Sequence, residues 1–264
     1  MSKLAIIAGQ GALPAALVAA LPDRPMICAL DGFAPEGLPV DQIFRVERLA
    51  LFLRLLEDQA ITQVIFAGAV QRPRLDPSLF DPQTAQMVPR LLAAMQAGDD
   101  ATLREVIAIF EEAGFEVVGV EAIAPALLPP AGVLTGTLTA QHETDASRAE
   151  TITVALGTVD VGQGCVVSQG LCLAVEALPG TDAMLASLSL IPASLRPKGG
   201  LYYKAAKPGQ DRRIDLPTIG VETIRRAAEA GLSGIAFQAG SVICLDLAAM
   251  ITAAQANDLL LWAR

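Results

Sequence analysis

The densest group of reactive side chains lies between residues 207 and 220, in the stretch KPGQDRRIDLPTIG. It places two carboxylates, three cations and a threonine among two prolines, ahead of an expected helix. Within it, Asp215 stands between Ile214 and Leu216, with Pro217 one residue further on. A carboxylate in an apolar, proline-stiffened loop is either paired structurally or acts as a metal ligand or general base. The residues alone leave both interpretations open.

Further polar candidates come earlier in the second half of the chain. Glu176 stands in a strand-like run, and Gly180-Thr181-Asp182 follows it at an expected turn from strand to helix. Four cations could clamp phosphate groups, or could equally be solvated surface charges: Lys204, Lys207, Arg212 and Arg213. The four cysteines form no CxxC pair and the chain has one histidine, so a Cys/His zinc cluster is excluded. Any metal is therefore expected to be Mg²⁺ or Mn²⁺, which take oxygen ligands.

A glycine turn follows the first apolar run of the chain. Gly9-Gln10-Gly11 leads from residues 4–8 into a helical pattern, which is the place of a dinucleotide-binding fingerprint. Asp31 lies roughly 20 residues further on, where such folds hold a ribose hydroxyl with a carboxylate. Pro14 stands in the place of the third glycine. Contact of Gly9 and Gly11 with a nucleotide and a plain tight turn are therefore equally favoured, and a bound NAD is disfavoured.

A pair of acids, Asp99 and Asp100, precedes another helical pattern. Carboxylates at that position cap a helix and interact favourably with its dipole. This structural role is favoured over a place in an active site, which stays open as the alternative.

The first half of the chain alternates short apolar runs with amphipathic patterns. The runs at 4–8, 26–30, 63–67 and 115–120 lack period-two alternation, as expected of parallel strands covered on both faces. Apolar stripes at helical spacing predict three helices, over Leu49 to Ala60, Val88 to Met95 and Leu103 to Phe110, with Gly114 ending the third. This order predicts an α/β fold with a Rossmann-like, doubly wound parallel sheet in residues 1–123.

Prolines and glycines cluster in residues 124–137, which we interpret as a linker between two domains. Residues 138–264 are then a distinct, mixed α/β catalytic domain. Its expected helices lie at 143–156, after Thr181, at 221–230 and from 247. Its expected strands lie at 165–168, 171–178 and 201–206, with two more around Gly240.

Composition limits the partners. With 53% hydrophobic and 18% charged residues the chain is of the globular class. A net charge of −9 argues against a nucleic-acid partner, which needs a basic face, and against purely electrostatic docking on anionic lipid. Residues 4–21 are nearly uncharged, but Gly9, Gly11 and Pro14 interrupt them, so a strand, turn and helix are expected there rather than a signal peptide or membrane span. We expect a cytoplasmic protein with reduced cysteines.

Several motifs together resemble one family, the UDP-2,3-diacylglucosamine pyrophosphatases of the LpxI type. They run almost from end to end of the chain: LAIIAGQGALP (4–14), FAGAVQRP (66–73), GDD (98–100), GFEVVG (114–119), DVGQG (160–164), LAVE (173–176), GTDAML (180–185) and residues 207–220. The GTDAML and DLPTIG blocks are the specific ones, whereas the glycine turn alone would not identify the family. In this family a glutamate usually precedes Gly-Thr-Asp, and Pro179 stands there instead.

The resemblance implies a Mg²⁺-dependent hydrolase of lipid A biosynthesis, which splits UDP-2,3-diacylglucosamine into UMP and 2,3-diacylglucosamine 1-phosphate (lipid X). Asp215 matches the family's essential aspartate and is expected to be catalytic and a metal ligand. We expect Asp182 and Glu176 as further metal ligands. Expected substrate-binding residues are Gly9, Gly11, Asp99, Asp100, Gly180, Thr181, Lys207, Gln210, Arg213 and Thr218. Transient contact with the inner membrane surface and a homodimer are also expected.

Two alternative functions stay open at this point. A nucleotide-dependent oxidoreductase is favoured by Gly9, Gly11 and Asp31, and disfavoured by the irregular second half. A non-catalytic carrier of a lipid-linked nucleotide sugar is favoured by the high apolar content.

Overall fold

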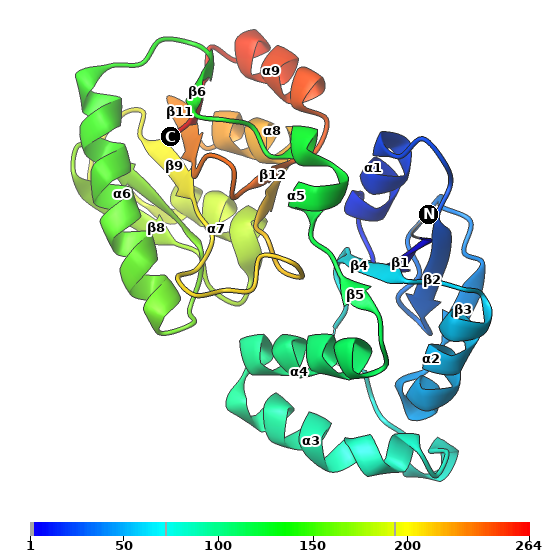
Figure 1. Cartoon of the computed structure of the whole chain (residues 1–264). Coiled ribbons are helices and arrows are strands. Elements are labelled where there is room, and N and C mark those ends of the chain that lie inside the picture. The colour runs from blue at the N-terminus through cyan, green and yellow to red at the C-terminus, as the bar shows by residue number, and fades with distance from the viewer. Residues whose placement is uncertain (1–2, 72, 193) are drawn as a thin grey trace. The chain divides into compact units, whose positions relative to one another are not determined.

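The computed structural model describes residues 3–71, 73–192 and 194–264, and they form two compact units (Figure 1). Unit 1 comprises Met1–Ala124 together with Asp211–Asp215, and unit 2 comprises Pro125–Gln210 together with Leu216–Arg264. The chain thus leaves unit 2 after Gln210 and returns to it at Leu216. The single linker expected at residues 124–137 does not account for this second passage.

Unit 1 is built on a five-stranded parallel sheet of order β3-β2-β1-β4-β5. Its strands are β1 (Leu4–Ala8), β2 (Met26–Leu30), β3 (Gln42–Phe44), β4 (Gln63–Ala67) and β5 (Glu116–Val117). This is the order of the first five strands of a Rossmann sheet. β1, β2 and β4 have the predicted bounds, whereas β5 is shorter than the predicted run at 115–120 and β3 was not predicted.

The helices of unit 1 are α1 (Leu13–Ala20), α2 (Leu49–Asp58), α3 (Thr84–Ala97), α4 (Asp99–Glu112) and the short α5 (Val120–Ile123). The apolar faces of α2 and α4 pack on one face of the sheet, where Phe110 contacts Phe52, Phe66 and Phe115. Gly114 ends α4 as predicted. Its φ is +92°, and the N–H groups of Gly114 and Phe115 donate to the carbonyls of Glu111 and Phe110 at 2.9 and 3.1 Å.

Unit 2 is built on a six-stranded mixed sheet of order β6-β13-β11-β9-β7-β8. Its strands are β6 (Gly132–Thr135), β7 (Gly164–Ser168), β8 (Leu171–Val175), β9 (Leu201–Lys204), β11 (Gly234–Phe237) and β13 (Leu260–Ala263). β9, β11 and β13 are parallel, and β6 and β7 each pair antiparallel with a neighbour. A separate parallel pair joins β10 (Thr218–Ile219) to β12 (Ile243–Cys244). β6 lies within the stretch interpreted as a linker.

Helices cover both faces of this second sheet. α6 (Ala140–Thr158) packs through Ala146 and Ala149 on the face that includes Tyr203. α7 (Gly180–Ser187), α8 (Val221–Glu229) and α9 (Leu247–Ala256) pack on the opposite face, which includes Tyr202. The prediction of an α/β protein with one parallel sheet and a distinct mixed α/β unit is confirmed.

Short 3₁₀ turns complete the chain at Val46–Arg48, Pro77–Leu79, Pro125–Leu127 and Leu188–Leu190. In the part of the chain that the structure describes, every helix is too short or too polar to cross a membrane.

Candidate active site

A buried ion pair lies in unit 2, between Lys204 at the end of β9 and Glu176 just after β8. The Lys204 Nζ is 3.4 Å from both carboxylate oxygens of Glu176, and the two side chains are 6% and 10% exposed. The same Nζ donates to the Thr181 Oγ1 at 2.8 Å. Thr181 belongs to the first turn of α7, so one buried ammonium links the end of the sheet to the start of this helix.

Two glycines of the DVGQG motif make room for Glu176. A Cβ on Gly164 would lie 2.6 Å from the Glu176 Oε2, and a Cβ on Gly162 would overlap the Glu176 carbonyl oxygen. The Glu176 N–H also donates to the Gly164 carbonyl at 2.8 Å. The motif is thus explained by the close approach of its backbone to the ion pair.

Tyr202 completes this group. Its hydroxyl donates to the Glu176 Oε2 at 3.3 Å and lies 3.3 Å from the Thr181 Oγ1. Burial, with the nearby charge of Glu176, raises the pKa of Tyr202 well above its ordinary value. The phenol therefore stays protonated and acts as a donor. The charge of the Lys204 ammonium is balanced by Glu176, so it is the N–H groups at the start of α7 that favour an anionic oxygen beside the half-buried Thr181.

The other predicted site residues of unit 2 make contacts that do not involve the group formed by Lys204, Glu176, Thr181 and Tyr202. The Asp182 side chain is 59% exposed and lies 3.7 Å from the Arg226 Nε. Lys207 pairs with Asp160 at 2.6 Å, and the Gln210 Oε1 accepts from the Lys207 N–H at 3.2 Å. The Thr218 hydroxyl donates to the Leu216 carbonyl at 3.4 Å. The structure thus brings Glu176 and Thr181 together through Lys204, and brings Lys207 and Gln210 together.

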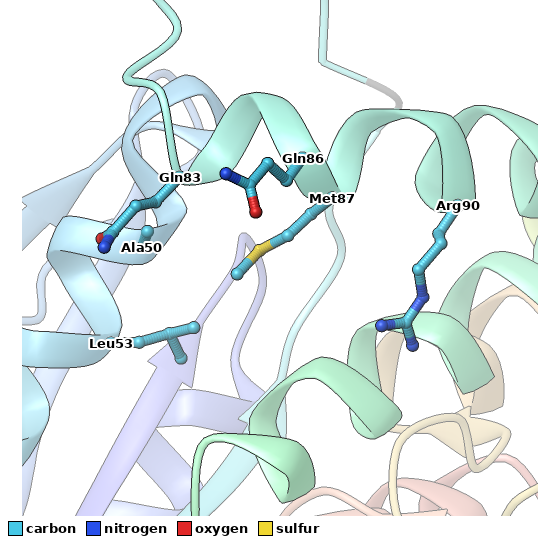
Figure 2. Close-up of a pocket in the computed structure, with 6 residues that line it drawn as sticks. All are labelled: Ala50, Leu53, Gln83, Gln86, Met87 and Arg90. Carbon is cyan, nitrogen blue, oxygen red and sulfur yellow. The ribbon is translucent and has the colours of Figure 1, made fainter.

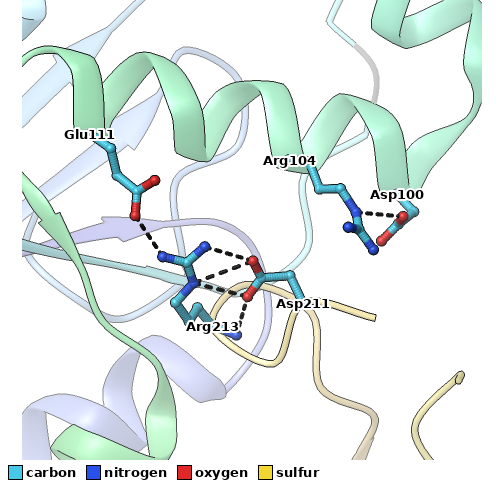
Figure 3. A network of polar contacts seen from close by, with 5 residues as sticks. All are labelled: Asp100, Arg104, Glu111, Asp211 and Arg213. Atoms are coloured by element: carbon cyan, nitrogen blue, oxygen red, sulfur yellow. Dashed lines mark hydrogen bonds and ion pairs between the residues drawn. The ribbon is translucent and has the colours of Figure 1, made fainter. Parts of the chain in front are cut away.

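Asp215 belongs to unit 1 and ends the segment Asp211–Asp215. It is half-buried, and its N–H donates to the Asp211 carbonyl at 3.4 Å. Its neighbour Ile214 packs against the apolar core of unit 1. Arg213 pairs with Asp211 and with Glu111 on α4, so its guanidinium is neutralised by carboxylates of the protein (Figure 3).

The glycine turn after β1 is explained by packing. Gln10 and Ala69 exchange two backbone hydrogen bonds of 2.9 and 2.8 Å, and a Cβ on Gly9 would lie 2.6 Å from the Ala69 carbonyl oxygen. Gly11 has a φ of +95° and open space around it, as a turn residue requires. Asp31 is exposed and pairs with Arg45 at 3.1 Å. These contacts account for the turn without a nucleotide and weaken the oxidoreductase alternative.

Of the two acids at the start of α4, only Asp100 has a side chain that the structure describes. The Asp100 carboxylate pairs with Arg104 one turn further along the helix at 2.8 Å, and it is 46% exposed. The side chain of Asp99 lies outside what the structure describes. The N-cap residue of α4 is Gly98, so Asp100 lies in the first turn, where a carboxylate suits the helix dipole, but it does not cap the helix as was predicted.

A groove of about 500 Å³ lies between α2 and α3 of unit 1 (Figure 2). It is lined by Ala50, Leu53, Gln83, Gln86, Met87 and Arg90. Arg90 already pairs with Glu105 at 2.7 Å and with Glu112 at 2.8 Å, so its charge is neutralised. Because no predicted site residue lines this groove, we do not place the active site there.

The carboxylates that the structure describes are too dispersed for a metal cage of protein ligands. Within residues 3–71, 73–192 and 194–264, no group of three or more His, Cys, Asp or Glu side chains is placed to hold a metal. Glu176 faces an ammonium, which disfavours a cation beside it. Mg²⁺ in phosphate chemistry, however, is commonly bound by one or two carboxylates plus water and substrate phosphates. The expectation of Mg²⁺ held by Asp215 therefore stays a prediction.

Two polar contacts escaped the sequence analysis. Lys204 was weighed as a phosphate clamp, but its pairing with Glu176 was not foreseen, although a lysine in the apolar run LYYKAA is itself a signal of a buried partner. Glu111 was not considered, because a glutamate on an amphipathic helix looks like an ordinary solvated acid.

The fold and the site define a two-unit α/β protein, in which a parallel sheet precedes a mixed-sheet unit holding a buried Lys–Glu pair. Residues 3–127 match the LpxI N-terminal domain, and residues 130–262 match the LpxI C-terminal domain. A protein of Caulobacter vibrioides (strain ATCC 19089 / CIP 103742 / CB 15), named UDP-2,3-diacylglucosamine pyrophosphatase LpxI, is 38% identical over 265 residues, covering 96% of this chain and 94% of that protein. The chain belongs to the LpxI family. The predicted family is confirmed, and the predicted enzyme class agrees with the name of this relative.

Proposed function

We propose that this protein hydrolyses the pyrophosphate bond of UDP-2,3-diacylglucosamine, giving UMP and 2,3-diacylglucosamine 1-phosphate for lipid A biosynthesis. One observation carries the proposal: 38% identity to a UDP-2,3-diacylglucosamine pyrophosphatase over 96% of the chain. The kinds of side chain in the two units support it, because pyrophosphate hydrolysis requires neutralised phosphoryl oxygens and an oriented water.

The residues divide these tasks as follows. Asp215 orients the attacking water and accepts its proton. Thr181, held by Lys204, and the N–H groups of the first turn of α7 bind a phosphate oxygen. Asp215 would also hold a Mg²⁺ ion, which would neutralise charge on the phosphoryl group. Mn²⁺ could replace Mg²⁺ in this role. Lys207 and Gln210 remain candidates for contact with the substrate.

The test is product analysis by mass spectrometry with UDP-2,3-diacylglucosamine. We expect UMP and the lipid phosphate in equal amounts when Mg²⁺ is present, no turnover in excess EDTA, and recovery when Mg²⁺ or Mn²⁺ is restored. Bound substrate without any UMP release would instead identify a carrier. Full activity in excess chelator would remove the metal from the mechanism.

The substrate is acylated, so we expect a cytoplasmic enzyme that collects it at the inner membrane surface. Three strongly exposed leucines of unit 2 support lipid contact: Leu178, Leu190 and Leu195. A homodimer is also expected. Vesicle flotation and light scattering of the purified protein test these two expectations.

A further inference from the structure

The segment that carries Asp215 is anchored to residues far away in the sequence. Residues 211–215 lie inside the stretch that matches the LpxI C-terminal domain, yet they pack as part of unit 1. Ile214 joins the apolar core of unit 1. Gly119 passes so close that a Cβ on it would lie 3.1 Å from the Arg213 Cα. Backbone packing and an apolar side chain thus hold the segment in unit 1.

Arg213 adds a directional anchor to this packing. Its Nη1 donates to the Glu111 Oε1 at 2.6 Å, on α4 (Figure 3). Its Nη2 and Nε donate to the Asp211 Oδ2 and Oδ1 at 2.7 and 3.0 Å. The hydrogen bond from Arg213 is the largest cause that holds the pKa of Asp211 below its ordinary value, and Arg104 contributes from α4. Forked arginine–carboxylate pairs of this kind fix orientation as well as supplying attraction.

Asp211 connects Arg213 to the backbone of Asp215 through hydrogen bonds. Its carboxylate accepts the Arg213 N–H at 3.0 Å, and its carbonyl accepts the Asp215 N–H at 3.4 Å. A chain of contacts therefore leads from Glu111 through Arg213 and Asp211 to the proposed catalytic residue. We propose that Glu111, Arg213 and Asp211 form a clamp that positions Asp215, and that Arg213 serves there instead of binding substrate. The clamp rests on the proposed role of Asp215 in hydrolysis.

The test compares Glu111→Gln with Glu112→Gln. Glu112 is the next residue of α4 and pairs with Arg90 on α3, so its replacement removes the same charge without touching the clamp. Misplacing a catalytic group by about 1 Å can cost on the order of a hundredfold in rate. Because Asp211 still holds Arg213 in Glu111→Gln, we expect kcat to fall by about tenfold and KM to stay within about twofold. Glu112→Gln should change kcat by less than about twofold.

Melting temperatures separate positioning from folding. Glu111 is 46% exposed, so both variants should fold and melt within a few degrees of each other. A wild-type kcat in Glu111→Gln overturns the clamp, and so does a loss of kcat that is matched by a loss of folded protein. Asp215→Ala is assayed in parallel. If that variant turns over normally, the proposed function of Asp215 fails, whereas an inactive Asp215→Ala beside a fully active Glu111→Gln rejects the clamp alone.

Discussion

Replacing Lys204 with methionine is the sharpest test of the buried ion pair. Methionine replaces the four-carbon apolar stem of lysine with one of equal atom count but lacks the ammonium that faces Glu176 and Thr181. The Glu176 carboxylate is then left 10% exposed, with the Tyr202 hydroxyl at 3.3 Å as a neutral donor. A buried charge without its counter-ion is much less stable than the same charge in water.

The expected cost follows from this geometry. Both oxygens of Glu176 lie 3.4 Å from the Lys204 Nζ, and both side chains are nearly enclosed, so the pair belongs to the buried class. Removing one partner of such a pair costs about 3–5 kcal/mol. Replacing both partners with apolar residues often costs nothing. We therefore expect Lys204→Met to lose about 4 kcal/mol, and Lys204→Met with Glu176→Leu to recover at least about half of that loss.

Denaturant unfolding followed by tryptophan fluorescence measures this loss as a change in the free energy of unfolding. Trp262 is the one tryptophan of the chain and lies in β13, in the sheet that also contains β9. Lys198→Met is the matched control, because Lys198 is exposed and its loss should stay within about 0.5 kcal/mol. A Lys204→Met protein as stable as Lys198→Met, or a double variant less stable than Lys204→Met, would refute the assignment of a stabilising buried pair.

Two further predictions concern unit 2. Asp145 is 2% exposed and accepts the N–H groups of Gln169 and Gly170 at 3.1 and 2.7 Å, so Asp145→Ala should cost about 3 kcal/mol in the same unfolding assay. A loss below about 1 kcal/mol would mean that these bonds to the β7–β8 turn add little. A hydrogen bond from Cys165 lowers the pKa of the exposed Cys172 to about 7, so its alkylation by iodoacetamide should rise with pH through about 7. A midpoint near the ordinary value of 9, in wild type as in Cys165→Ala, would contradict this.

The parts of the fold that the sequence predicts are those fixed by local pattern. β1, β2 and β4 are central strands covered on both faces, so each appears as an unbroken apolar run with clear ends. The end of α4 at Gly114 could be predicted as well, because a helix end with positive φ favours glycine. By contrast, β3 is a half-exposed edge strand of three residues, and β6 forms by antiparallel pairing with β13, more than a hundred residues away. Neither has a local signal of its own.

For the candidate site, too, local sequence features could be predicted and long-range contacts could not. The motifs around Glu176, Thr181 and Asp215 could be selected from the sequence, because their residue types stand out against an apolar background. The residues that these side chains contact could not be predicted. Arg213 and Glu111, for example, are 102 positions apart, and they meet only because residues 211–215 pack as part of unit 1. Gly9 shows the limit of a motif: the Ala69 backbone explains why glycine stands there, and contact of Gly9 with a nucleotide stays a prediction.

Turnover of Asp215→Ala tests the central claim most directly. The variant removes a half-buried carboxylate from a loop that Ile214 and Pro217 still hold, so the fold should survive. If Asp215 orients the water or holds Mg²⁺, UMP release from UDP-2,3-diacylglucosamine should fall by about a thousandfold or more while the substrate still binds. Melting temperature and UMP release are measured on the same preparation. A folded Asp215→Ala protein with near-normal turnover would contradict the assignment.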